Sequence, residues 1–278
     1  DAFEVLGGDW DLSEVAISLA FNVTRALNPS TCEWEESVYA FAYFYIPLNP
    51  PCGGGGMGSP PQGPSPYDQN GVFPDPEGSG GEAEDCPTET SLSAGEYVWF
   101  ESDANIVTLE RVYDNATGSI YYIGNNLTMA DYVPGQMYDL HTQGDPDAIG
   151  EYLLEGVQPT VPADWQWLSP NLCGLVHDRS DDFPMQWTPA QTYPDAIFAV
   201  RIPGTIEALG KGGFAGVIPW DDGEHTFLSS EIGQLAAEQV GFQAYSYIEG
   251  PLFGFPESIY QENQSDSYIA YVANFVLQ

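Results

Sequence analysis

The sequence predicts an all-β protein built of two immunoglobulin-like β-sandwich domains, and three observations support this prediction. Short runs rich in aromatic and β-branched residues recur along the chain, with apolar and polar positions alternating. Turn-forming residues separate these runs at the spacing typical of β-sandwiches. Few segments have helical periodicity. The hydrophobic share of 43 % and the aromatic share of 14 % are sufficient to form real cores.

The first two strands are expected before residue 47. Residues 9–26 fit a helix or a strand, and the loose alternation of apolar residues from Val15 to Val23 favours a strand. Residues 37–47 are typical of a strand, because the segment is dense in aromatic residues and ends at a proline.

A long loop is expected over residues 47–93, inserted in the first domain. The segment is rich in proline, glycine and acidic residues, so it lacks the apolar surface that would offset the entropy lost on ordering. Cys52 and Cys86 lie near its two ends, and a disulfide between them would close the loop at its base. That pairing leaves Cys32 to bond with Cys173. The loop is either a partner-binding arm or a solvated insertion.

Two series of strands follow the loop. A proline-rich joint that begins at Gln158 separates them, and it divides the chain into a domain of residues 1–158 and a domain of residues 159–278. The strands expected in the first series are 96–101, 107–113, 120–124, 136–142 and 152–157. The strands expected in the second series are 185–188, 196–202, 214–219, 240–249 and 267–277.

The second domain is expected to contain a hairpin and a short helix. Asp221, Asp222 and Gly223 are typical of a tight turn, because glycine readily adopts a positive φ. We expect this turn to join a strand over residues 216–220 to a return strand over residues 224–228. Ser229 is then expected to cap a helix over residues 230–237.

Charge narrows the choice of partners. The chain carries 41 acidic residues against 5 basic residues, a formal net charge of −36. Such a surface repels nucleic acid and anionic membranes, and no apolar run is long enough for direct membrane insertion. Salt or divalent cations would screen the self-repulsion. The charge therefore indicates a saline habitat, bound calcium, or simply a surface that keeps the protein soluble.

Several features indicate export to an extracellular or cell-surface location. The four cysteines lack zinc-site spacing and fit two disulfides in an oxidising compartment. The chain starts at Asp1 without methionine, as expected of a processed, exported form. Sequences for N-glycosylation agree with export, and they occur at Asn22, Asn115, Asn126 and Asn263.

A series of short motifs resembles a known family over about two thirds of the chain, from Cys86 onward. The motifs are Cys86-Pro, Ser93-Ala-Gly-Glu-Tyr-Val-Trp-Phe, Val133-Pro-Gly, Phe183-Pro-Met-Gln-Trp-Thr and Val217-Ile-Pro-Trp-Asp-Asp-Gly. Their order resembles secreted or lipoprotein-type two-domain β-sandwich proteins of myxobacteria and related deltaproteobacteria. The resemblance implies an envelope or extracellular location and a non-catalytic sandwich. The chain departs from the family at Gly216 or Val217, where a cysteine is usual.

Candidate catalytic residues are few, so we expect no enzyme. His141, His177 and His225 lack metal-ligand spacing, and no Gly-x-Ser-x-Gly motif is present. An extracellular glycoside hydrolase is the alternative, since the acidic loops offer many carboxylates. The same loops are either solvated turns or calcium sites with oxygen ligands. The candidate ligands are Asp145, Asp147, Asp178, Asp181, Asp221 and Asp222.

Trp165 and Trp167 alternate on an expected strand, so both rings face one side. Packing between the two domains is favoured, and an exposed pair that stacks on a sugar is the alternative. The sequence therefore predicts a secreted or cell-surface structural or binding protein that assembles with itself, another surface protein or a glycan. A carbohydrate-binding module is the alternative among non-catalytic functions.

Overall fold

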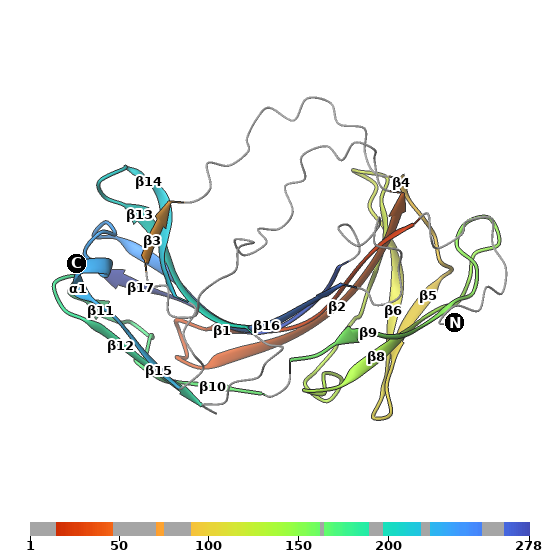
Figure 1. The fold of residues 1–278 in the computed structure, drawn as a ribbon, viewed down its shortest axis with the longest axis horizontal. Helices are drawn as coiled ribbons and strands as arrows, with labels where there is room; N and C mark the ends of the chain where they lie inside the picture. The colour runs from red at the N-terminus through yellow and green to blue at the C-terminus, as the bar shows by residue number, and fades with distance from the viewer. Residues whose placement is uncertain are drawn as a thin grey trace.

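The computed structural model describes residues 15–46, 71–74, 90–161, 164–188, 197–217, 223–251 and 264–278. The protein is all-β, as predicted, and the described ranges contain one helical turn. Their strands form a fourteen-stranded sheet and a three-stranded sheet. The large sheet bends into a deep curve, and the small sheet lies on its convex side (Figure 1).

The large sheet contains, in spatial order, β3 (Gly71–Pro74), β14 (Lys211–Val217), β13 (Ile197–Ile206), β16 (Gln239–Pro251), β17 (Gln264–Leu277), β1 (Ala16–Leu27), β2 (Trp34–Ile46), β7 (Ile120–Ile123), β6 (Ile106–Tyr113), β5 (Tyr97–Glu101), β8 (Met137–Thr142) and β9 (Leu153–Pro159). Two short strands complete it, β4 (Thr90–Ser91) beside β2 and β11 (Val176–His177) beside β17. The small sheet contains β10 (Gln166–Ser169), β12 (Phe183–Thr188) and β15 (Glu224–Phe227).

The first and last long strands meet in the middle of the large sheet. β1 and β17 pair in parallel, with Val23 beside Ile269, while β2 and β16 flank them in antiparallel pairs. One hydrogen-bonded sheet therefore contains strands from both sides of the expected boundary at 158/159. The immunoglobulin-like two-domain arrangement is not confirmed, and the division of the chain stays a prediction.

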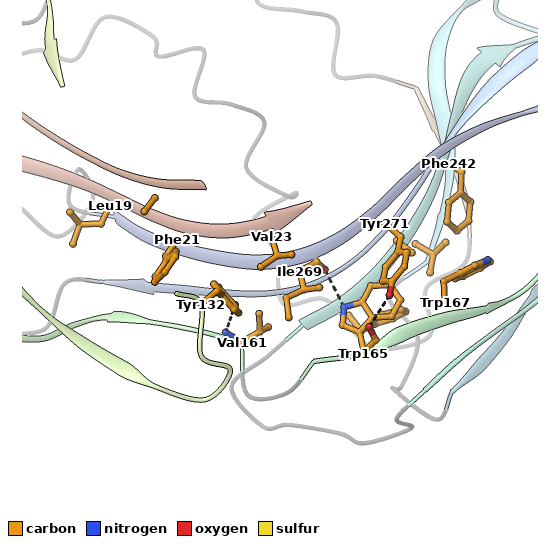
Figure 2. Packing of buried hydrophobic residues seen from close by; sticks show 14 of the residues in the cluster. Leu19, Phe21, Val23, Tyr132, Val161, Trp165, Trp167, Phe242, Ile269 and Tyr271 are labelled. Carbon is orange, nitrogen blue, oxygen red and sulfur yellow. Dashed lines mark hydrogen bonds between the residues drawn. The ribbon is translucent and has the colours of Figure 1, made fainter. Parts of the chain in front are cut away.

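The core lies on the convex side of the large sheet. Every second residue of β1 points there, and Ile17, Leu19 and Phe21 are fully buried. Tyr132 packs edge-on against Phe21 with ring centroids 5.1 Å apart, as Figure 2 shows. β9 folds back against β17 and β1, so the end of the large sheet and the small sheet cover this side together.

Three local predictions are wrong. Residues 71–74 form β3 within the segment expected to be a structureless loop, because they pair with β14 and become the edge strand of the large sheet. The expected hairpin partners do not pair in the described residues, because β14 pairs with β13 and β3, whereas β15 pairs with β12 in the other sheet; residues 218–222 lie outside the described residues. The helix α1 is a single turn, Ser229–Ile232. It stops there because the chain turns at Gly233 and Leu235 bridges to Ile206 of β13.

A disulfide joins Cys32 to Cys173, with Cα atoms 5.4 Å apart, and confirms that predicted pairing. It links the turn between β1 and β2 to the segment between β10 and β11. The disulfide is compatible with an oxidising compartment. Cys52 and Cys86 lie outside the described residues.

Arg25 of β1 forms an ion-pair network beside the core. Its guanidinium donates to both carboxylate oxygens of Asp164, at 2.7 and 3.2 Å, and to Glu36 at 3.0 Å. It also donates to the backbone oxygen of Trp165 at 2.9 Å. Burial alone would lower the pKa of Arg25, but the hydrogen bonds to Asp164 and Glu36 and the nearby Tyr271 raise the pKa above its usual range. This network ties β1 and β2 to the entry of β10.

Candidate functional site

A row of aromatic side chains lies on the face of β2 opposite the core. Strand residues alternate between faces, so Ala40, Ala42 and Phe44 are buried in the core, and the residues between them point to the concave side. The other face therefore carries Tyr39, Phe41, Tyr43 and Tyr45. The rings of Tyr39 and Phe41 stack with centroids 6.1 Å apart, and those of Tyr43 and Tyr45 stack at 5.0 Å.

Neighbouring strands extend this row in both directions. Tyr121 of β7 lies 6.1 Å from Phe41, measured between ring centroids. Tyr268 of β17 pairs directly opposite Tyr247 of β16, so both point to the same side. Tyr245 lies next to Tyr247 with centroids 5.5 Å apart. We call this surface the aromatic face, and it comprises Tyr39, Phe41, Tyr43, Tyr45, Tyr121, Phe214, Tyr245, Tyr247 and Tyr268.

The aromatic face lies on the concave side of the curved sheet, as Figure 1 shows for the strands that carry it. Between β2 and β16, the strand β1 contributes small or short side chains, including Ala20, Asn22 and Thr24. Asn22 accepts a hydrogen bond from the backbone N–H of Tyr268 at 3.0 Å. The short side chains of β1 thus lie between the rings of β2 and those of β17 and β16.

Tyr39 of the aromatic face interacts electrostatically with Tyr121 and Tyr268. Tyr39 is 42 % exposed. Burial raises its pKa, and the nearby hydroxyls of Tyr121 and Tyr268 raise it further. The raised pKa keeps the Tyr39 hydroxyl neutral at ordinary pH. A tyrosine hydroxyl can both donate and accept a hydrogen bond. The face thus offers flat apolar rings with polar tips.

One end of the aromatic face holds a cation between two rings. The guanidinium carbon of Arg201 in β13 lies 5.0 Å from the ring centroid of Phe214 and 5.4 Å from that of Tyr245, distances typical of cation–π contacts. Gly216 pairs opposite Arg201. A Cβ atom on Gly216 would lie 2.7 Å from the ring of Phe214, so glycine is needed there for the ring to lie over the backbone.

The two tryptophans singled out in the sequence are buried, with exposed fractions of 4 % for Trp165 and 8 % for Trp167. Trp165 packs against Tyr271 at 4.5 Å and Trp167 against Phe242 at 4.6 Å, measured between ring centroids (Figure 2). The indole N–H of Trp165 donates to the backbone oxygen of Ile269 at 3.1 Å. The rings pack between the small and large sheets, so the alternative of sugar stacking by this pair is wrong.

The candidate calcium ligands Asp145 and Asp178 bind their own loops. Asp145 accepts a hydrogen bond from the backbone N–H of Asp147 at 3.1 Å. Asp178 accepts one from the N–H of Ser180 at 2.9 Å and one from its hydroxyl at 2.8 Å. Such bonds lower the pKa of Asp178, and a hydrogen bond from Ser93 and that from Asp147 lower the pKa of Asp145. These contacts are typical of turns stabilised by aspartate.

Within the described ranges, no three His, Cys, Asp or Glu side chains form a group able to hold a metal ion. Asp181 contributes its backbone oxygen to a contact of 3.1 Å with His177 Nε2. Asp221 and Asp222 lie outside the described residues. Calcium binding stays a prediction.

The three histidines lie on different strands, His141 on β8, His177 on β11 and His225 on β15. His141 stacks on Trp99 with ring centroids 5.0 Å apart, and its Nε2 lies 3.1 Å from a carboxylate oxygen of Glu101. His177 packs against Phe183, and His225 packs against Phe227. Each histidine thus packs against an aromatic ring, and the partners of His177 and His225, Phe183 and Phe227, pair opposite each other.

The glycosylation sequences differ in accessibility. Asn115 and Asn126 are exposed, whereas Asn22 is only 7 % exposed and is held by Tyr268. A glycan on Asn22 would have to displace that contact. Asn263 lies outside the described residues.

Sequence reasoning missed the aromatic face and Arg201. The signal for the aromatic face was present, because aromatic residues occupy alternate positions at 39, 41, 43 and 45. Arg201 carried no local signal, since its two flanking rings come from β14 and β16.

No protein-family model matches the chain, and no curated protein matches it. In the parts of the chain that the structure describes, no helix is long and apolar enough to cross a membrane. The resemblance to myxobacterial sandwich proteins stays a prediction.

Proposed function

We propose that this chain is an exported, non-catalytic binding protein that holds an extended glycan across the aromatic face. The row of stacked rings on the concave side, with Tyr39 42 % exposed, carries this proposal. The solvent side of a half-buried sheet is usually polar, and clustered aromatic residues on a surface mark recognition sites.

Charge and ring chemistry together favour a glycan over other ligands. A net charge of −36 disfavours nucleic acids and other strongly anionic polymers. Tyrosine rings offer flat apolar surfaces with a polar tip, which suit a sugar that presents C–H groups on one face and hydroxyls at its edge. The proposal places carbohydrate binding on the aromatic face rather than on Trp165 and Trp167.

Export is supported by the Cys32–Cys173 disulfide and by the exposed sequences for N-glycosylation at Asn115 and Asn126. Extracellular proteins form disulfides and meet polysaccharides of cell surfaces and matrices. Salt at physiological strength screens most of the charge repulsion beyond about 8 Å, so the acidic surface is compatible with a saline exterior.

A panel of soluble and insoluble polysaccharides, incubated with the purified full chain, tests the proposal. We expect saturable binding to at least one glycan, and binding at least tenfold weaker for Tyr39→Ala. The matched control is Tyr113→Ala, because Tyr113 is 59 % exposed on β6 and lies outside the aromatic face. Equal binding by both variants and the native chain would exclude this site.

Self-assembly is the other function predicted from the sequence, and a stacked aromatic surface also suits a second copy of the chain. Light scattering of the native chain and of Tyr39→Ala, over a range of salt concentrations, separates the two functions. If the aromatic face binds a glycan and not a second copy, Tyr39→Ala should leave the oligomeric state unchanged. Association that Tyr39→Ala abolishes would assign the aromatic face to assembly instead.

A further inference from the structure

Arg201 differs from Arg25 and Arg179 in its partners; Arg111 also has no carboxylate within 4.0 Å among the described residues, but it donates to the Ser93 hydroxyl at 3.2 Å. Arg25 and Arg179 each form an ion pair with described carboxylates, at 2.7 Å to Asp164 and 2.6 Å to Glu207. Among the described residues, no carboxylate oxygen lies within 4.0 Å of the Arg201 guanidinium, which has rings for neighbours. In a chain with 41 acidic residues, such an arginine is conspicuous.

Its surroundings hold Arg201 in one orientation. Phe214 and Tyr245 contact the guanidinium from two neighbouring strands, and Gly216 leaves the space that the Phe214 ring occupies. Burial raises the pKa of Tyr245 while the charge on Arg201 opposes that rise, as expected for a cation beside the phenol. A guanidinium fixed in this way loses little conformational entropy when it binds an oxyanion.

The position of Arg201 connects it to the proposed glycan site. Four strand-to-strand steps separate β13 from β2, in the order β13, β16, β17, β1 and β2. At about 4.8 Å for each step, the separation across the strands is about 19 Å, and the pairing register places Arg201 level with Glu35, four residues along β2 from Tyr39. A single oligosaccharide of several rings can therefore contact both.

We propose that Arg201 binds a carboxylate on the glycan, so that the ligand is a mostly neutral oligosaccharide with one acidic sugar at the Arg201 end. This inference rests on the proposed function. The planar guanidinium matches a carboxylate with two parallel hydrogen bonds. A single negative charge satisfies Arg201, whereas a densely charged polymer would be repelled by the net charge of −36.

Titration calorimetry with two matched probes tests the inference. The probes are a tetrasaccharide of three neutral hexoses ended by one glucuronic acid, and the same tetrasaccharide with its carboxyl reduced to an alcohol. We expect the native chain to bind the acidic probe at least tenfold more tightly than the reduced probe. Arg201→Gln should remove this preference and still bind the reduced probe. Arg201→Lys should keep only part of the preference, because an ammonium cannot pair with both oxygens in one plane.

Lys211→Gln is the matched control, since it removes one positive charge from the neighbouring strand β14 and should leave the preference unchanged. A preference that persists in Arg201→Gln, or that Lys211→Gln also removes, overturns the inference. Equal binding of both probes by the native chain, weakened by Tyr39→Ala, would leave the proposed function standing and reject the role of Arg201. Failure of both probes and of the polysaccharide panel would reject both. Thermal unfolding of each variant checks folding, and Arg201→Lys serves if Arg201→Gln does not fold.

Discussion

Arg25 and Asp164 form a two-point contact, with Nη1 2.7 Å from Oδ1 and Nη2 3.2 Å from Oδ2. The contact joins the central strand β1 to the segment that leads into the small sheet. It therefore helps to hold the small sheet on the convex side, where Trp165 and Trp167 pack.

Replacing Arg25 with methionine should lower the free energy of unfolding by about 3 kcal/mol, because the carboxylates of Asp164 and Glu36 then lose this partner and the backbone oxygen of Trp165 keeps only the hydroxyl of Tyr271. Asp164→Asn should cost less, about 1 kcal/mol, since Asp164 is partly exposed. Urea unfolding measures both values. The control is Glu96→Gln at an exposed position, and an effect of Arg25→Met no larger than the control would contradict this role.

The Cys32–Cys173 disulfide spans 141 residues, so its removal should destabilise the protein strongly. The double variant Cys32→Ser with Cys173→Ser should lower the free energy of unfolding by about 2–5 kcal/mol, because the unfolded chain gains freedom. Urea unfolding measures the loss. Peptide mapping without reductant should recover Cys32 linked to Cys173, and recovery of either residue in another pair would refute the connectivity.

Buried tyrosines predict a loss of stability in alkali. Burial raises the pKa of Tyr132 above its ordinary value of 10.0. Its hydroxyl is hydrogen-bonded with Ser267 at 2.9 Å and with the N–H of Val161 at 3.0 Å. Above pH 10 the unfolded chain releases this proton while the folded chain keeps it, so stability is fully present below pH 10 and falls as pH rises through the folded-state pKa.

Urea unfolding from pH 8 to pH 11 measures how the free energy of unfolding depends on pH. This range spans the ordinary pKa of tyrosine, roughly 10. Tyr132→Phe should be less stable at neutral pH, because it has lost two hydrogen bonds. Its free energy of unfolding should fall less steeply with rising pH than that of the native chain. The same slope in both proteins would show that Tyr132 does not contribute.

Gly216→Ala should disturb the cation site without blocking the rest of the aromatic face. The new Cβ would meet the Phe214 ring at 2.7 Å, so the ring must move away from Arg201. We expect the preference for the acidic probe to fall at least threefold, close to 0.6 kcal/mol. Gly241→Ala is the control, because its Cβ would meet only Pro203 at an ordinary 3.5 Å. If Gly216→Ala kept the full preference for the acidic probe, the position of Phe214 would not matter for carboxylate binding by Arg201.

Local patterns predicted most strands but not their partners. Alternation and aromatic content identified the segments at 240–249 and 267–277, which the structure extends to Gln239–Pro251 and Gln264–Leu277. The parallel pairing of β1 with β17 depends on contacts between the two ends of the described chain, and no local pattern encodes it. The same reason explains why β15 lies in the small sheet.

The candidate site was hidden for a related reason. The alternating aromatic residues of β2 can be seen in the sequence. The sequence does not show which face of β2 the core covers, because the strands packed against β2 decide that. Trp165 and Trp167 are equally aromatic and are buried because the small sheet closes over the large one. Arg201 could not be identified from the sequence, because the rings beside it, Phe214 and Tyr245, come from the neighbouring strands β14 and β16.

Protection of Tyr39 from chemical nitration, measured by mass spectrometry with and without the acidic tetrasaccharide, tests the central claim most directly. Tyr39 and Tyr113 are both exposed, but only Tyr39 lies on the aromatic face. We predict that saturating tetrasaccharide slows the nitration of Tyr39 at least fivefold, which corresponds to a free-energy difference near 1 kcal/mol. The nitration rate of Tyr113 should stay unchanged. Equal nitration of Tyr39 with and without the glycan would contradict the account.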